Sequence, residues 1–176
     1  MTTTDYRRLL EAASFAARAH DGQFRKDGLT PYIGHPFRVC IVVRDLFGFD
    51  DPRILITALL HDTIEDTTTD FDDIEKRYGH EIATWVSCLS KDKRMPDRQR
   101  ELAYLQRIQE APWQVQVCKL ADIFDNLMDI PHLPAERRGH AIARAEQYLA
   151  ALRHVTAPEV KAPIALVEQL LAEVKT

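Results

Sequence analysis

The chain has 176 residues, of which 45% are hydrophobic, and its formal net charge is -4. This length fits one domain that buries a core of its own. The weak negative charge argues against a protein that coats a nucleic-acid polymer, because phosphate backbones attract basic surfaces. It does not exclude a small phosphorylated ligand, since a bound metal ion reverses the local electrostatic field.

Neither a disulfide framework nor a membrane anchor is expected. The three cysteines, Cys40, Cys88 and Cys118, are scattered through apolar stretches and are predicted to be buried small hydrophobes. The N-terminus lacks a basic-then-apolar signal pattern, and no apolar run approaches the roughly 20 residues that span a bilayer. We therefore expect a cytoplasmic protein with no membrane partner. The sequence does not indicate an oligomeric state.

Helical spacing of apolar residues begins at the N-terminus. A first helix is predicted over about 5–21, capped by Thr4 or Asp5. Glycines and prolines then punctuate a loop over 22–34. A second helix is predicted over 35–48, with a proline in its first turn, where no amide donor is needed.

A third helix is predicted over 53–65, and it is apolar on most sides. Such a helix usually lies at the centre of a fold. Its C-terminal end carries the polar residues His61, Asp62, Glu65 and Asp66. Carboxylates at that end oppose the helix dipole, so the pattern indicates a compensating cation.

The rest of the chain is also predicted to be helical. The expected helices cover about 70–78, 81–90, 102–110, 112–127, 135–154 and 159–174. The polar stretch 91–100 is predicted to be a loop or a helix entry. The sequence has no glycine-rich phosphate loop, no alternating strand pattern of useful length and no internal repeat. The predicted class is all-α.

Residues of metal-ligand type come from separate segments of the chain: His35, His61, Asp62 and Asp122. Neutral imidazoles and carboxylates suit a divalent ion that activates water. An ion that prefers octahedral coordination, such as Mn²⁺, keeps two positions free after binding four ligands. One of these positions can hold a water molecule and the other a phosphoryl oxygen.

Helical spacing assigns roles to neighbouring polar residues. Glu65 follows Asp62 by three positions and Asp66 follows it by four, so these carboxylates share one side of the predicted helix. They are placed to orient a metal-bound water molecule or to accept its proton. Asn126 follows Asp122 by four positions and is predicted to face the same cavity.

Each of these residues also has a simpler interpretation, such as a solvated helix end. Their combination favours a metal site, because a helix that is apolar on most sides carries several of them at its C-terminal end. Other polar residues are predicted to lie outside it. His20 is expected to be a surface histidine, with a position beside the metal ligands as the alternative. Residues 91–94 are expected to form a solvated loop, with a position at the border of the pocket as the alternative. Arg137 and Arg138 are expected on a helix surface, and His140 has no partners at ligand spacing.

Three segments resemble the motifs of the hydrolase domain of the RelA/SpoT family, and most of all the stand-alone small alarmone hydrolases. Their order and spacing match over residues 7–130. The segments are 19–28 with 31–36, 58–67, and 119–122 with Asn126. The resemblance implies an HD-domain helical bundle that forms a single domain over 1–176, although the match weakens from about residue 135.

The resemblance also implies an activity and a set of roles. The activity is hydrolysis of guanosine 3′,5′-bis(diphosphate) and of the pentaphosphate at the 3′-pyrophosphate, releasing pyrophosphate. The partner is thus a small-molecule nucleotide. The implied residues are His35, His61, Asp62 and Asp122 as ligands of Mn²⁺, Glu65 and Asp66 as the catalytic acidic pair, and Arg25, Lys26 and Asn126 as substrate contacts.

The chain departs from the family pattern at positions that are usually basic. Ile123 and Met128 occupy two such positions, and Asp97 occupies a third. A second hypothesis is therefore an HD phosphohydrolase that acts on another nucleotide, either an adenosine alarmone or a phosphorylated dinucleotide cofactor. A third is a binding module without activity, although all six ligand and acidic positions are present. No further regulatory domain is expected in this length.

Overall fold

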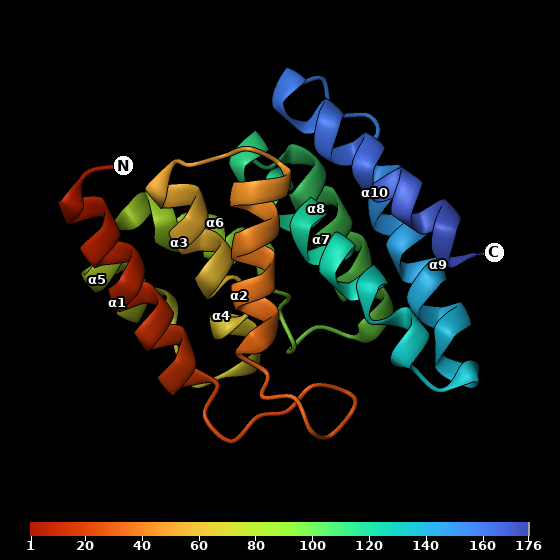
Figure 1. Cartoon of the computed structure of the whole chain (residues 1–176), viewed down its shortest axis with the longest axis horizontal. Helices are drawn as coiled ribbons and strands as arrows, with labels where there is room; N and C mark the ends of the chain where they lie inside the picture. The colour runs from red at the N-terminus through yellow and green to blue at the C-terminus, as the bar shows by residue number, and fades with distance from the viewer. Residues whose placement is uncertain (176) are drawn as a thin grey trace.

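The computed structural model describes residues 1–175, and its elements are helices (Figure 1). No strand occurs in this part of the chain, so the all-α prediction is confirmed. The α-helices are α1 (Thr3–Ala19), α2 (Gly34–Ile41), α3 (Pro52–Leu60), α4 (Thr63–Asp66), α5 (Phe71–Tyr78), α6 (His80–Leu89), α7 (Asp97–Glu110), α8 (Trp113–Met128), α9 (Ala135–Leu152) and α10 (Lys161–Val174). A π-helical turn, η1 (Val42–Leu46), extends α2, and short 3₁₀ turns, η2 (Ile130–His132) and η3 (Pro158–Val160), precede α9 and α10.

The first helix begins earlier than predicted. Its cap is Thr2, whose hydroxyl accepts a hydrogen bond from the backbone amide of Asp5. The Asp5 carboxylate in turn accepts a hydrogen bond from the backbone amide of Thr2. Asp5 therefore acts from inside the first turn as half of a capping box, and not as the cap itself. After α1 the chain forms a long loop that crosses the end of α2 (Figure 1).

The prediction of one helix over 53–65 is wrong in detail. The helix α3 ends at Leu60, and a turn at His61 and Asp62 separates it from α4. Side chains satisfy the last carbonyls of α3, since His61 Nδ1 donates to the carbonyl of Ala58 and the Thr63 hydroxyl donates to that of Leu60. These local bonds compete with the next helical turn.

The helix α3 lies between two hydrophobic clusters, as its apolar sequence predicts. Ile54 and Leu55 belong to the cluster that also includes α8, α9 and α10. Ile56 and Leu60 belong to the cluster that includes α1, α5 and α6. In Figure 1, α1 and α5 lie on one side of the molecule and α9 and α10 on the other. The buried turn after α3 is thus held in the middle of the fold.

The cysteines are unpaired, as expected. Cys118 is buried, while Cys40 and Cys88 are half-buried. Within residues 1–175, every helix is too short or too polar to cross a bilayer.

Candidate active site

A cavity of about 530 Å³ lies between the centre of the fold and α9. The loop before α2, the α3–α4 turn, α8 and α9 all contribute to its walls. The predicted metal-ligand residues lie together in it, namely His35, His61, Asp62 and Asp122. Segments that are far apart in the sequence therefore meet at one place.

The ligand atoms of these residues are close to one another. One potential ligand atom from each of His35, His61 and Asp62 lies within 4.8 Å of the others. His35 Nε2 lies 3.5 Å from Asp62 Oδ2 and 3.1 Å from Asp122 Oδ1. His61 Nε2 lies 3.0 Å from Asp62 Oδ2 and 3.9 Å from Asp122 Oδ1. Asp122 lies outside that group of three, but its Oδ1 approaches the Nε2 atoms of both histidines.

The hydrogen bond made by His61 Nδ1 leaves the Nε2 atom of the same ring for this centre. His61 Nδ1 lies 2.8 Å from the carbonyl oxygen of Ala58, so it must carry the proton. His61 Nε2 is buried, and it lacks a hydrogen-bond partner in the described chain, because its approach to Asp62 has poor hydrogen-bond geometry. A buried nitrogen lone pair without a partner beside carboxylates fits a divalent cation.

In the absence of a bound cation, protonated imidazoles and the Lys119 ammonium balance the negative charge of the carboxylates. Burial lowers the pKa of His35, but hydrogen bonds with Asp122 and Asp125 outweigh it and raise the pKa to about 9. Burial raises the pKa of Asp62, and the neighbouring His61 and His35 outweigh it and hold that pKa well below its usual value. A divalent cation would take the place of the imidazole proton.

Further contacts orient the carboxylates. The Tyr32 hydroxyl donates to Asp62 Oδ2 at 2.6 Å. Lys119 Nζ lies 2.7 Å from Asp122 Oδ2, and Asn126 Nδ2 lies 2.6 Å from Asp122 Oδ1. Asn126 therefore reaches the cavity as predicted, and it also supports a predicted ligand.

Glu65 and Asp66 lie on α4 and both line the cavity. The backbone amide of Lys91 donates to Glu65 Oε2 at 2.8 Å. Burial raises the pKa of the Glu65 carboxyl. The more exposed Asp66 forms an ion pair with Lys93, whose Nζ lies 2.7 Å from Asp66 Oδ1. The two carboxylates therefore differ in environment.

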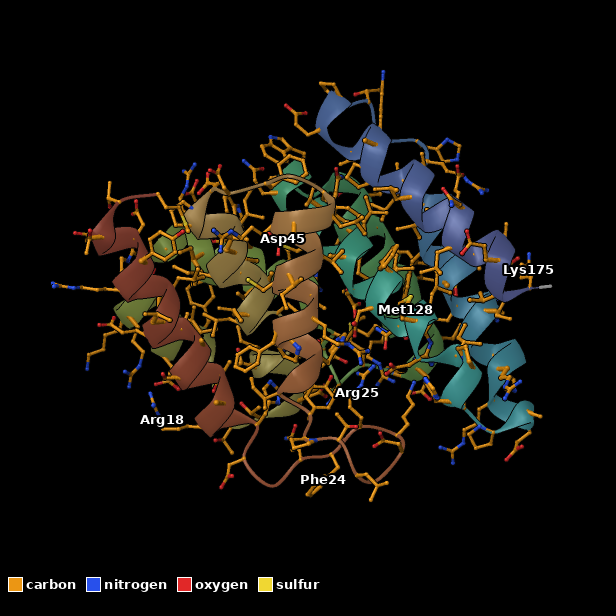
Figure 2. The ribbon with its side chains drawn as sticks, viewed as in Figure 1. Arg18, Phe24, Arg25, Asp45, Met128 and Lys175 are labelled. Atoms are coloured by element: carbon orange, nitrogen blue, oxygen red, sulfur yellow. The ribbon has the colours of Figure 1, made fainter. Side chains whose placement is uncertain are left out.

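Arg25 and Lys26 line the same cavity. In Figure 2 the Arg25 side chain extends from the loop toward the bundle. Arg25 Nη2 donates to Asp129 Oδ2 at 2.5 Å and to Asn126 Oδ1 at 3.3 Å. Burial lowers the pKa of the Lys26 ammonium. The loop therefore brings two cations to the cavity.

Sequence reasoning missed the α9 side of the cavity. Arg137, His140 and Arg144 line it, and their spacing places them on one helix face. That spacing was visible in the sequence, but only the fold shows that this face borders the cavity. Tyr148 lies deeper, and its hydroxyl accepts a hydrogen bond from Lys91 Nζ at 2.6 Å.

The prediction for His20 is wrong. This histidine is 2% exposed, and it packs against the ring of Tyr32 with centroids 4.9 Å apart. Its Nδ1 donates to Gln23 Oε1 at 2.8 Å, and Gln23 in turn donates to the carbonyl of Asp66. The loop folds back over the end of α1, which the sequence pattern did not indicate.

Comparison with known proteins gives consistent results. Residues 12–154 match the family described as HD domain. Several relatives are named guanosine-3′,5′-bis(diphosphate) 3′-pyrophosphohydrolase MESH1, among them those of Xenopus tropicalis and human. The chain is 36% identical to the Xenopus tropicalis protein over 83% of its own length and 81% of the relative's. It is 38% identical to the human protein over 80% and 78% of the two lengths.

A solved structure has the same fold. It is described as a metazoan ortholog of SpoT that hydrolyzes ppGpp and plays a role in starvation responses. The TM-score is 0.80 at 28% identity, and the match covers 92% of this chain and 94% of the other. The matched share of the chain is therefore larger than residues 7–130, which carry the predicted motifs.

Proposed function

The chain belongs to the HD-domain family, and from this membership we propose that it is a metal-dependent 3′-pyrophosphohydrolase of guanosine 3′,5′-bis(diphosphate) and the pentaphosphate. The observation that carries the proposal is the composition of the cavity, which has a cluster of metal-ligand residues at one wall and cations at the others. The names of the MESH1 relatives support this substrate class.

We propose Mn²⁺ as the cation, held by His35, His61, Asp62 and Asp122, because two imidazoles and two carboxylates suit it and leave two positions of an octahedron open. When bound, the cation supplies Lewis acidity, which lowers the pKa of a water ligand and offsets charge on phosphoryl oxygens.

The protein's own residues perform the remaining steps. Glu65, fixed by the amide of Lys91, accepts the proton of the attacking water, and Asp66 stands beside it. The water oxygen bonds to phosphorus as the bond from phosphorus to the 3′ oxygen breaks. The 3′ oxygen takes up the proton that Glu65 accepted, which restores the carboxylate, and pyrophosphate is released. The products are a nucleoside 5′-diphosphate, or the 5′-triphosphate from the pentaphosphate, and pyrophosphate.

Cations around the cavity suit a substrate that carries phosphate groups at both its 3′ and its 5′ position. Arg25 and Lys26 approach from the loop, and Arg137 and Arg144 from α9. Guanidinium groups bind phosphate oxygens in pairs. We assign Arg25, Lys26 and Asn126 to the substrate, with Asn126 also holding Asp122.

One observation favours the second nucleotide class. Ile123, at a usually basic position, is buried and lines the cavity as an apolar surface. An adenosine alarmone or a phosphorylated dinucleotide cofactor therefore remains the alternative. We further propose that the enzyme is a single domain over 1–176 and acts in the cytoplasm, without a nucleic-acid or membrane partner.

Product analysis with purified protein and Mn²⁺ tests the proposal. Guanosine tetraphosphate is expected to yield pyrophosphate and guanosine diphosphate in equal amounts. Orthophosphate as the main product would contradict cleavage at the 3′-pyrophosphate. A higher kcat/KM for an adenosine alarmone or a phosphorylated dinucleotide would favour the alternative.

A further inference from the structure

The histidine that begins the cluster is joined to a carboxylate that the proposed mechanism does not use. His35 Nδ1 lies 2.6 Å from Asp125 Oδ2, and the two residues are 90 positions apart in the sequence. Both are buried, with exposures of 2% for His35 and 3% for Asp125. The contact connects α2 to α8 directly behind the metal-facing Nε2 of His35.

A guanidinium fixes this carboxylate from the other side. Arg38 Nε lies 2.5 Å from Asp125 Oδ1, and Arg38 Nη2 lies 3.0 Å from Asp125 Oδ2. Arg38 follows His35 by three positions on α2, so one helix supplies both partners of Asp125. The paired geometry limits rotation of the carboxylate.

The same guanidinium reaches a second carboxylate. Arg38 Nη2 lies 2.6 Å from Asp129 Oδ1, and Asp129 also accepts Arg25. Arg38 is thus held between Asp125, in the last turn of α8, and Asp129, the residue that caps the C-terminus of that helix. Its own side chain is 44% exposed, so its charge is partly screened by solvent. The fixed fork of hydrogen bonds, more than the net charge, defines its effect on Asp125.

We propose that Asp125 is a positioning residue for metal binding, and that Arg38 holds Asp125 in place for this task. The proposal rests on the metal site described under Proposed function. A carboxylate that accepts Nδ1–H keeps the proton on that nitrogen, orients the ring and makes Nε2 a better donor to the metal. Asp125 stands in that relationship to His35.

A purely structural role would have different consequences. If Asp125 only tied α2 to α8, its replacement would lower stability without a specific effect on metal affinity. The useful readouts are therefore the Kd for Mn²⁺ and the visible absorption of the Co²⁺-substituted protein. Neither depends on substrate or turnover.

The test compares Asp125→Asn, Arg38→Lys and Asp45→Asn in full-length, chelator-treated protein. Asp125→Asn removes the charge but keeps the shape of the side chain, and Arg38→Lys keeps the charge but removes the fork. Asp45→Asn is the matched control, because Asp45 is an exposed carboxylate at the η1 end of the same helical segment, away from Arg25 (Figure 2). Thermal unfolding without metal reports whether each variant folds.

Asp125→Asn is expected to raise the Kd for Mn²⁺ by about 10-fold to 100-fold and to shift the Co²⁺ absorption bands. Arg38→Lys is expected to raise the Kd by about tenfold, and this variant decides the question if Asp125→Asn does not fold. Asp45→Asn is expected to match the unchanged protein.

Two negative results have separate meanings. If Asp125→Asn folds and its Kd for Mn²⁺ is within twofold of that of the unchanged protein, the positioning role is overturned and the metal site stands. If Asp125→Asn does not fold, the same result in Arg38→Lys has the same meaning. Absence of Mn²⁺ binding by the unchanged protein would overturn the metal site proposed above, and this inference with it.

Discussion

Lys119 Nζ lies 2.7 Å from Asp122 Oδ2 in the interior of the cavity, where the two residues are only 6% and 8% exposed. Burial disfavours both charges, but their attraction outweighs it. The pKa of Lys119 therefore lies well above its usual value and that of Asp122 well below. The ammonium balances a carboxylate that is also a predicted metal ligand.

Replacement of Lys119 by methionine is expected to destabilise the metal-free protein by about 3–5 kcal/mol, because the buried Asp122 carboxylate loses the ammonium that pairs with its Oδ2. Excess Mn²⁺ should restore part of this loss, since the cation supplies positive charge to Asp122. Denaturant unfolding with and without Mn²⁺ measures both effects. An equal loss in the two conditions would show that Asp122 does not bind the metal.

Replacement of Glu65 by glutamine is expected to lower kcat by about 10²-fold to 10⁴-fold, the usual contribution of a general base. Glu65 must be deprotonated to act, and burial raises its pKa. Activity of the unchanged enzyme should therefore fall with decreasing pH before an ordinary glutamate would protonate. The pH–rate profile measures this limb, which should be absent from the residual activity of Glu65→Gln. The exposed Glu136, changed to glutamine, is the control, and equal kcat values in the two variants would exclude this role for Glu65.

Replacement of Arg144 by glutamine is expected to raise KM about tenfold or more, the range for a lost hydrogen bond to a charged group, with a smaller effect on kcat. Arg144 lines the cavity from α9 and lies far along the chain from the proposed catalytic acids. Arg153→Gln is the matched control, because Arg153 pairs with Glu168 and does not line the cavity. Steady-state kinetics with the tetraphosphate separate the two variants. Equal KM values would show that α9 does not contact substrate.

Replacement of Leu149 by alanine is expected to cost about 2–5 kcal/mol of unfolding free energy, because a fully buried leucine leaves a cavity. Leu149 belongs to the same cluster as α3 and α8, so the protein should still unfold in one transition. Calorimetry of Leu149→Ala, with the exposed Leu102→Ala as control, checks both points. A separate early transition would contradict the single domain.

The sequence predicted the helices and the metal-type residues because both follow local rules. Apolar spacing identified α3 as central, and residue type and order identified His35, His61, Asp62 and Asp122. The break after Leu60 was not predicted, because the apolar run gives no sign of it. It depends on side-chain bonds from His61 and Thr63 to backbone carbonyls.

Contacts between residues far apart in the chain cannot be predicted from the local spacing of residue types. The pairing of His35 with Asp125 joins residues 90 positions apart, and no local signal connects them. The α9 wall was missed for a similar reason, since Arg137 and Arg144 look like an ordinary exposed helix face until α9 packs beside α8. His20 was misplaced because the loop that covers it has no periodicity.

The most direct test of the proposed metal-dependent hydrolysis is pyrophosphate release from guanosine tetraphosphate by chelator-treated protein, before and after stoichiometric Mn²⁺ is returned. The treated protein should remain folded and release almost no pyrophosphate, and Mn²⁺ should restore the activity in unchanged protein but not in Asp62→Ala. Full activity in the treated protein, or equal activity in Asp62→Ala, would contradict a hydrolytic centre built on His35, His61, Asp62 and Asp122.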